Sequence, residues 1–396
     1  MDLEAFEWLL TDEGQALLAR AGELVASGAP PLAVQTELRR STAPAYVAAA
    51  LTQVDLRDKG RAKFGDLAAR MYFTPDGLEQ ATRLAVGDHR AARLAAFEAA
   101  SVIDLGCGIG GDLVASARAG ITAAGVDLDP VRVAVAGANL AALGLAGAVQ
   151  VADATEVDHS PFAVAFADPA RRGARGRVFD ADGWTPPWSF VESLLRRDSC
   201  VKVAPGIPHE LVPDGVEAEW VSDHGDVKEA ALWSGLLATT ARRATVIGEG
   251  GLATLTSEDA PSPGEAGAGV MPVGAYLYEP DGAVIRAGLV TAVAAGVRGG
   301  LLDEHIAYVT SEAAYTTPFA RSYRVIEELP YREKQLRAAL RERDIGRLTI
   351  KKRGVAVTPE GLRKRLALQG DHEATVVLTR VAGEGTCLLV EPLPPS

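Results

Sequence analysis

The stretch that decides the fold is Ser101–Asp112, SVIDLGCGIGGD. Val102, Ile103 and Leu105 form an apolar run that predicts a buried strand. Four closely spaced glycines follow: Gly106, Gly108, Gly110 and Gly111. The next residues, LVASARAG, have helical spacing. Glycines let backbone N–H groups approach a ligand, and a helix N-terminus favours an anionic group. A strand, a glycine turn and a helix in this order are typical of folds that bind adenosine-containing cofactors.

The glycines alone do not distinguish between such cofactors, because Gly106-x-Gly108-x-x-Gly111 also matches the dinucleotide-binding fingerprint. Asp104 does distinguish them, since it lies two residues before the first glycine. A carboxylate there repels a pyrophosphate but can pair with the ammonium end of a methionine moiety. DLGCGIG resembles the first motif of class I S-adenosylmethionine-dependent methyltransferases. The resemblance implies that S-adenosyl-L-methionine (SAM) is the cofactor.

Two further acids end predicted strands. The second strand, 121–130, reaches Asp127 sixteen residues after the last glycine, where a doubly wound fold places the acid that binds ribose hydroxyls. Asp129 is the weaker candidate, because Pro130 should open the next helix. The third strand, AVQVAD, ends at Asp153, and the family resemblance implies that this position contacts adenine. The predicted cofactor-binding residues are Asp104, Gly106, Gly108, Gly110, Asp127 and Asp153.

The fourth strand, FAVAFA, runs directly into Asp168-Pro169-Ala170-Arg171-Arg172. Ligands of open α/β sheets bind at the carboxyl ends of the strands, so this segment should face the transferable methyl group. It resembles the D/N-P-P-aromatic motif of methyltransferases that modify exocyclic amines, but alanine replaces the second proline and arginine the aromatic residue. We expect Asp168, with Pro169, to orient or deprotonate the acceptor. Arg171 and Arg172 then position an anionic group, unless they are a solvated basic loop.

The N-terminal region is predicted to be helical. Thr74 as N-cap, Pro75 at the first helical position and Asp76 in the first turn mark a helix start. With Tyr72 and Phe73, this segment resembles the aromatic-x-T-P-E segment of trimethylguanosine-synthase-like methyltransferases. The resemblance implies that one of the two aromatic rings contacts the cofactor or the substrate RNA. Alternatively, both are core aromatics of a helical cap.

The predicted fold class is α/β, with a Rossmann-like class I methyltransferase sheet, an N-terminal helical domain and a small α+β C-terminal domain. The helical domain covers 1–95 and the methyltransferase domain 96–255. Residues 256–272 are rich in Pro, Gly and Ala and are predicted to be a linker. A small α/β connecting unit follows over 273–330, and the C-terminal domain covers 331–396.

Residues 331–396 have the predicted order α-β-α-β-β. With the segments Ile350–Gly354 and Leu362–Lys364, this region is similar to the THUMP-like domain of a group of bacterial class I methyltransferases, which share the Asp168-Pro-Ala-Arg-Arg variant. The resemblance therefore covers the chain from about residue 70 to its end. It implies RNA as the partner, with tRNA or rRNA as candidates.

Charge is distributed unevenly along the chain. The formal net charge is −12, yet residues 331–365 hold twelve Lys or Arg against four acids, a local +8 on a chain that otherwise carries −20. We expect an RNA-binding surface there. The predicted contact residues are Lys351, Lys352, Arg353, Arg363 and Lys364, although alternation along a strand sends Lys352 to the side opposite its two neighbours. A solvated basic face without a partner is the alternative.

The sequence thus predicts a SAM-dependent RNA methyltransferase. A SAM-sensing RNA-binding protein without turnover is an alternative, and an NAD-dependent oxidoreductase is another that leaves Asp104 unexplained. The three cysteines, Cys107, Cys200 and Cys387, lie too far apart to suggest disulfides or a metal site. We expect no metal, no membrane segment and a cytoplasmic location. The sequence identifies neither the acceptor nor the oligomeric state.

Overall fold

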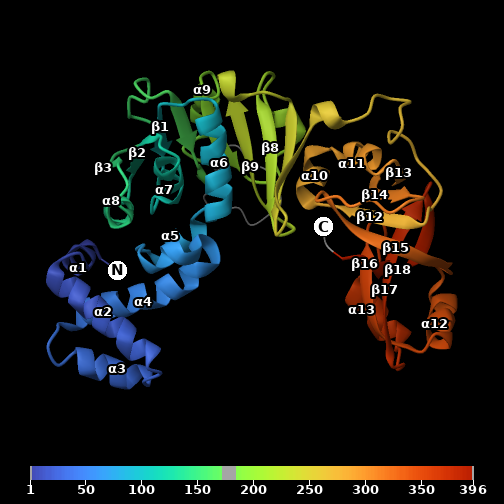
Figure 1. The fold of residues 1–396 in the computed structure, drawn as a ribbon, viewed down its shortest axis with the longest axis horizontal. Helices are drawn as coiled ribbons and strands as arrows, with labels where there is room; N and C mark the ends of the chain where they lie inside the picture. Colours follow the sequence, from blue (N-terminus) through green and yellow to red (C-terminus); the bar gives the residue numbers. More distant parts are fainter. Residues whose placement is uncertain (1, 172–183, 395–396) are drawn as a thin grey trace. The chain divides into compact units, whose positions relative to one another are not determined.

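The computed structural model describes residues 2–171 and 184–394 (Figure 1). The chain divides into two compact units. The first comprises Met1–Val203, Ile207–Val216 and Ala231–Ala238, and the second comprises Ala204–Gly206, Glu217–Ala230 and Thr239–Ser396. None of the described helices has both the length and the apolar character needed to cross a membrane.

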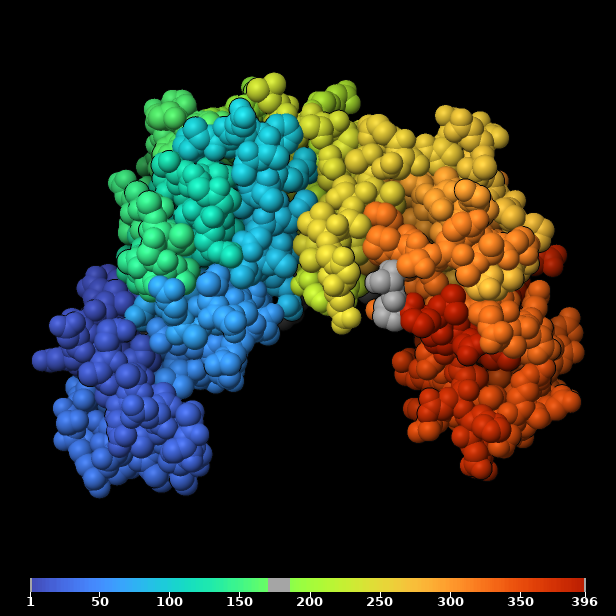
Figure 2. Space-filling view, viewed as in Figure 1, coloured from blue at the N-terminus to red at the C-terminus, as the bar shows by residue number. Residues whose placement is uncertain are grey.

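The N-terminal region is helical, as the sequence predicts. Figure 2 shows its surface in blue as one closely packed body. Its helices are α1 (Leu3–Leu9), α2 (Asp12–Ala26), α3 (Pro31–Leu38), α4 (Pro44–Phe64), a 3₁₀ turn (Gly65–Ala69), α5 (Pro75–Gln80) and α6 (Leu84–Ala96). The helix start predicted before α5 is confirmed, because the Thr74 hydroxyl accepts the Gly77 N–H at 3.0 Å with Pro75 in the first turn.

The main sheet has nine strands in the order β11-β10-β8-β9-β7-β4-β1-β2-β3. In the first unit, β1 pairs in parallel with β2 and β4, β2 with β3, and β4 with β7. This is the predicted Rossmann-like arrangement, in which the carboxyl ends of the parallel strands share one edge. The strands are β1 (Ser101–Leu105), β2 (Thr122–Asp127), β3 (Ala148–Val151), β4 (Val164–Ala167), β7 (Ser199–Val203), β8 (Glu217–Asp223), β9 (Asp226–Ser234), β10 (Arg242–Gly248) and β11 (Gly251–Thr256).

The helices of this region follow the strands in turn: α7 (Gly111–Arg118), α8 (Pro130–Leu143) and α9 (Trp188–Leu194). Buried side chains from β1, β4 and α7, among them Val102, Phe166 and Leu113, form one hydrophobic core. Strands β10 and β11 were not predicted. They form an antiparallel pair in which Gly248 lies opposite Gly251.

The second unit contains a seven-stranded sheet in the order β13-β14-β12-β15-β18-β17-β16. Its strands are β12 (Tyr276–Pro280), β13 (Gly300–Asp303), β14 (Ile306–Ser311), β15 (Ala320–Leu329), β16 (Ile345–Lys352), β17 (His372–Val381) and β18 (Glu384–Pro392). Its helices are α10 (Gly282–Ala287), α11 (Val290–Gly296), α12 (Glu333–Glu342) and α13 (Pro359–Leu366). The elements after residue 331 follow the predicted order α-β-α-β-β.

This sheet crosses the predicted boundary between the connecting unit and the C-terminal domain. Strand β15 belongs to the predicted connecting unit, yet it pairs with β18 along most of its length. Between β11 and β12 the described chain has one short 3₁₀ turn, Ser257–Asp259, and an isolated bridge from Val270 to Leu301. The domain limits given above therefore remain predictions.

The two faces of the C-terminal sheet differ. Helices α12 and α13 cover one face through Leu336, Leu340, Leu362 and Leu366. On the other face the sheet curves, so that the β13–β14 end approaches β17. The Ala382 N–H donates to the Leu302 carbonyl at 2.9 Å, and the Gly383 N–H donates to Asp303 Oδ2 at 2.9 Å. The curved face encloses a second core that includes Tyr308, Tyr323 and Val377.

Candidate cofactor and acceptor site

The glycine loop between β1 and α7 is open on one side. Gly106, Gly108 and Gly110 have φ angles of +111°, +54° and +80°, a region that glycine adopts at little cost. A Cβ atom at Gly106 or Gly108 would meet nothing within 4 Å. At Gly110 it would lie 3.0 Å from Ala136 Cβ, so this glycine lets α7 and α8 pack closely. The first two glycines therefore present backbone to open space, as a bound ligand requires.

Asp127 holds this loop from the end of β2. Its Oδ2 atom accepts the Gly108 N–H at 3.0 Å, and its Oδ1 atom accepts the Asp129 N–H at 2.9 Å. Asp129 instead caps α8 by accepting the Val131 N–H at 2.8 Å, as its position before Pro130 predicts. Asp127 is thus the acid next to the loop, and its carboxylate has further lone pairs for hydroxyl donors.

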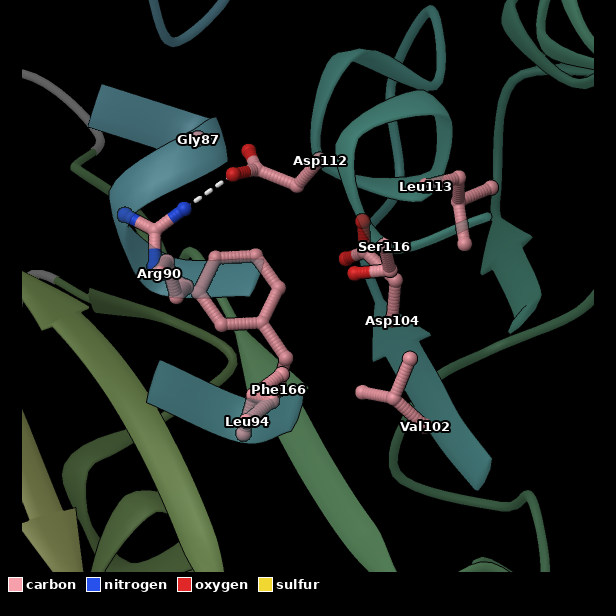
Figure 3. Close-up of a pocket in the computed structure, with 9 residues that line it drawn as sticks. All are labelled: Gly87, Arg90, Leu94, Val102, Asp104, Asp112, Leu113, Ser116 and Phe166. Carbon is pink, nitrogen blue, oxygen red and sulfur yellow. Dashed lines mark hydrogen bonds and ion pairs between the residues drawn. The ribbon is translucent and has the colours of Figure 1, made fainter. Parts of the chain in front are cut away.

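Asp104 lies behind the loop, in a small cavity enclosed by α6, α7, β1 and β4 (Figure 3). Its side chain is buried, and its Oδ1 atom has no hydrogen-bond partner among the described residues. Arg90 of α6 pairs with Asp112 of α7 and stacks over the Phe166 ring at 4.5 Å. The cavity volume is about 10 Å³, close to the minimum that one water molecule needs. Asp104 therefore offers an unsatisfied acceptor with little space beside it.

The charge state of Asp104 is shaped by its surroundings. Burial raises the pKa of Asp104 well above its usual value, and the carboxylates of Asp112 and Asp168 raise it further. Arg90 opposes this shift in the pKa because its positive charge favours the ionised form. A cation brought near Asp104 would act in the same direction as Arg90.

Asp153 follows β3 in an exposed turn. Its Oδ1 atom accepts the Thr155 N–H at 2.9 Å and the Thr155 hydroxyl at 2.7 Å, and these bonds lower the pKa of Asp153. Two exposed apolar side chains that the sequence analysis missed lie near this edge. Leu128 follows Asp127 and is 59% exposed, and Val151, which lies opposite Asp127 on β3, is 49% exposed. Exposed apolar groups beside polar ones are typical of ligand sites.

Asp168 follows β4 and is paired with a lysine. Its Oδ2 atom lies 2.6 Å from Nζ of Lys202, a β7 residue that the sequence analysis also missed. The available signal was a lone charge within the apolar strand CVKVAP. Pro169 is buried. The backbone of Arg171 belongs to a two-residue strand, β5 (Ala170–Arg171), which pairs with β6 (Trp184–Thr185). Arg172 lies outside the described residues.

Tyr72 and Phe73 are core residues of the helical region. The Tyr72 side chain is 5% exposed and Phe73 is fully buried. The Tyr72 hydroxyl donates to Gln15 Oε1 at 3.1 Å, and its ring meets Phe6 edge-on at a centroid distance of 5.7 Å. Phe73 packs against Phe64 with ring centroids 5.6 Å apart. The structure contradicts a direct contact of either ring with RNA and supports the alternative of core aromatics.

The Tyr72 backbone is nevertheless linked to the glycine loop. The Asn139 side chain of α8 accepts the Tyr72 N–H at 2.6 Å and donates to the Tyr72 carbonyl at 3.1 Å. The same amide donates to the Ile109 carbonyl, within the loop, at 2.8 Å. A Cβ atom at Gly77 of α5 would lie 2.4 Å from the Ile109 side chain, so α5 also packs on the loop. The aromatic segment thus supports the loop through its backbone.

The predicted RNA-binding residues lie on opposite faces of the C-terminal sheet. Lys351 points to the curved face, where its Nζ lies 2.5 Å from Glu279 Oε2 and 5.7 Å from the centre of the Tyr323 ring. Arg353 stacks on the same face, over Tyr308 at 5.5 Å. The prediction of one surface that joins these two residues to the following helix is therefore wrong. The physical reason is that the sheet curves around them.

Lys352, Arg363 and Lys364 are exposed on the helical side. The expectation that Lys352 faces away from its two neighbours is confirmed, because Ile350, two residues earlier, belongs to the core under α12 and α13. Arg363 donates through Nε to the Leu348 carbonyl at 2.9 Å, which holds α13 on β16. These three residues remain candidates for contacts with an anion.

The described residues offer little support for a metal site or for a nucleophilic cysteine. No group of three or more His, Cys, Asp or Glu that could hold a metal ion occurs in 2–171 and 184–394. Cys107, inside the glycine loop, is buried, and burial raises the pKa of its thiol. A cysteine thiolate is the nucleophilic form, and this environment disfavours it.

Comparison with protein families finds two matching regions. Residues 320–392 match the THUMP domain-like family, and residues 2–60 match a domain of unknown function (DUF8688). Among solved structures, a candidate methyltransferase from Porphyromonas gingivalis W83 is 22% identical and superposes with a TM-score of 0.72. The alignment covers 89% of this chain and 92% of that one, so the two share a fold over nearly their whole lengths.

Sequence similarity to curated proteins is stronger. Two records from Mycobacterium tuberculosis, strains CDC 1551 and H37Rv, describe an uncharacterized S-adenosylmethionine-dependent methyltransferase. Each is 38% identical to this chain over 340 residues, or 90% of its own length. Because the alignment also spans 82% of this chain, the protein belongs to the S-adenosylmethionine-dependent methyltransferases, and SAM is its cofactor.

Proposed function

We propose that this methyltransferase transfers the methyl group of SAM to RNA, with the acceptor presented to Asp168. The position of Asp168 carries the proposal: it follows β4, the parallel neighbour of the strand that leads into the glycine loop. Ligands of such sheets bind at this edge. Membership of the family removes the oxidoreductase alternative.

The residues of the loop region fit the cofactor. Gly106 and Gly108 leave open space for it, and Asp127 would accept the ribose hydroxyls beside the loop. The exposed side chains of Leu128 and Val151 would cover the adenine ring, with Asp153 at its rim. The buried acceptor on Asp104 would interact with the ammonium group through one water, since the cavity beside it has room for little more.

SAM supplies a methyl group made electrophilic by its sulfonium, so the protein's task is mainly orientation and exclusion of water. Asp168 would accept a hydrogen bond from the acceptor and take up the proton that the acceptor loses. Arg171 and Arg172 follow Asp168 after Pro169 and Ala170, and we propose that they pair with a phosphate of the acceptor.

RNA is favoured by two independent observations. The first is the match of residues 320–392 to the THUMP domain-like family. The second is the local charge of +8 on a chain of net charge −12. We propose that the contacts lie on the exposed helical side of the C-terminal sheet, hereafter the α12–α13 surface: Lys334, Arg341, Lys352, Arg363 and Lys364. Lys334, Lys352 and Lys364 form no ion pair within the described chain.

The test is methyl transfer from radiolabelled SAM to RNA extracted from cells that lack the protein. Label should enter this RNA and not RNA from wild-type cells, whose sites are already modified. Mass spectrometry of the labelled nucleoside then identifies the acceptor. If the protein binds SAM and RNA but transfers no label, it is a SAM-dependent RNA-binding protein. If it does not bind RNA, the acceptor belongs to another class of molecule.

A further inference from the structure

The proposed function leaves the lysine beside Asp168 unexplained. Lys202 Nζ lies 2.6 Å from Asp168 Oδ2 and 3.3 Å from Thr82 Oγ1. The pairing follows from the sheet, because Ala167 of β4 lies opposite Val201 of β7 and the next residue on each strand carries the charge. Both side chains thus leave the carboxyl edge of adjacent parallel strands together.

This lysine occupies an unusual position for its residue type. Its side chain is 17% exposed, and both neighbours on β7, Val201 and Val203, are buried. Holding a lysine this way costs free energy, because its ammonium loses hydration and its long side chain loses entropy. An apolar residue at this position would avoid the cost of lost hydration. Asp168 is the more accessible partner, with 36% of its side chain exposed. The carboxylate therefore faces the open edge, and the ammonium lies behind it.

We propose that Lys202 is a positioning residue for the methyl-transfer site, whose ammonium fixes Oδ2 of Asp168 so that Oδ1 is directed at the acceptor. The inference rests on the proposed role of Asp168. No described residue hydrogen-bonds to Oδ1, so this atom is available. Thr82, which precedes α6, gives the ammonium a second anchor and so limits the rotamers of the pair.

The pair also restricts the acceptor chemistry. A carboxylate held in one orientation can accept a hydrogen bond from an amine N–H, whereas no aspartate is basic enough to ionise a ribose hydroxyl. In the balanced step, the nitrogen lone pair bonds to the methyl carbon and the S–CH₃ electron pair stays on sulfur. The methylated nitrogen, now cationic, releases its proton to Oδ1. The Asp168–Lys202 pair therefore fits a nitrogen acceptor.

The experiment compares binding of SAM, a cation at sulfur, with S-adenosylhomocysteine, which lacks that charge, by calorimetry at one pH near neutrality. The full-length protein is used, with the variants Lys202→Met and Lys202→Arg. In wild type, the Asp168 carboxylate is held toward the transferable methyl group and should give a preference for SAM. In Lys202→Met the carboxylate is no longer held, and this preference should fall several-fold. Removal of a positive charge alone would raise the preference for a cation, so a fall reports lost positioning of Asp168.

Lys202→Arg keeps a cation beside Asp168 and should restore the wild-type preference for SAM. Lys228→Met is a matched control, because it removes another partly buried lysine, 3.2 Å from Asp226. An unchanged or increased preference for SAM in Lys202→Met would overturn the inference. If this variant does not fold, Lys202→Gln should show the same fall. If that variant also does not fold, a reduced preference in Lys202→Arg overturns the inference. Failure of wild type to methylate RNA contradicts the proposed function instead.

Discussion

Replacing Asn139 with leucine should separate support of the glycine loop from general stability. The side chain is fully buried and makes three hydrogen bonds, two with Tyr72 and one with Ile109. Leucine has a similar volume, so the main loss is hydrogen bonding. At about 0.5–1.5 kcal/mol for each bond, Asn139→Leu should cost about 1.5–4.5 kcal/mol of unfolding free energy. The bond to Ile109 alone corresponds to a loss of cofactor affinity of up to about tenfold.

Gln53 provides the matched control. It is also fully buried, and it holds the backbone of Phe73, a residue outside the loop, through two hydrogen bonds at 2.6 and 3.0 Å. Gln53→Leu should therefore lower stability by a comparable amount and leave affinity for S-adenosylhomocysteine unchanged. Denaturant unfolding and calorimetry on folded protein measure the two quantities. Equal affinity losses in both variants, or unchanged affinity in Asn139→Leu, would refute the reasoning.

Three further predictions concern the cofactor site and the proposed RNA-binding surface. Asp127→Ala should weaken SAM binding by about 1.5–3 kcal/mol, the scale of charge-assisted hydrogen bonds, and calorimetry showing unchanged affinity would remove Asp127 from the site. Asp104→Asn should stabilise the cofactor-free protein: the raised pKa of Asp104 means that wild type loses stability as pH rises above the unfolded value near 3.8. The variant's advantage in melting temperature should therefore be absent near pH 4 and grow with pH, and a constant difference would contradict this. Lys352→Ala with Lys364→Ala should reduce the logarithmic salt slope of RNA binding by nearly two, whereas Lys351→Met should leave it unchanged, and the reverse order would move the interface to the curved face.

Local patterns predicted the parts of the fold that depend on nearby residues. The apolar run before Gly106 became β1, and Thr74 and Pro75 began α5. Asp127 ends β2 and Asp168 follows β4, and the parallel pairing of these strands with β1 was expected from the strand–helix alternation. In these cases the residues that determine the structure lie within one or two neighbouring elements, and the tertiary contacts do not override their local preference.

Long-range contacts determined what the sequence could not show. The Lys202–Asp168 pair depends on the register between β4 and β7, which lie 34 residues apart along the chain. Lys351 and Arg353 look like surface cations in sequence, but the curvature of the sheet turns them toward Tyr323 and Tyr308. For Tyr72 and Phe73, aromatic character alone could not distinguish a binding surface from a core.

The hydrogen bond from Gly108 to Asp127 has a consequence for the rate of cofactor exchange. The positive φ angles of the loop fall on glycines, and Asp127 accepts two backbone N–H groups, so hydrogen bonds within the chain itself hold the loop in this shape. Neither arrival of the methyl donor nor departure of the demethylated product then requires the loop to refold. Association should approach the range for a small molecule entering an open, rigid site, and its rate should change little with solvent viscogens beyond the effect on diffusion. Turnover would then be limited by the acceptor rather than by exchange of the cofactor.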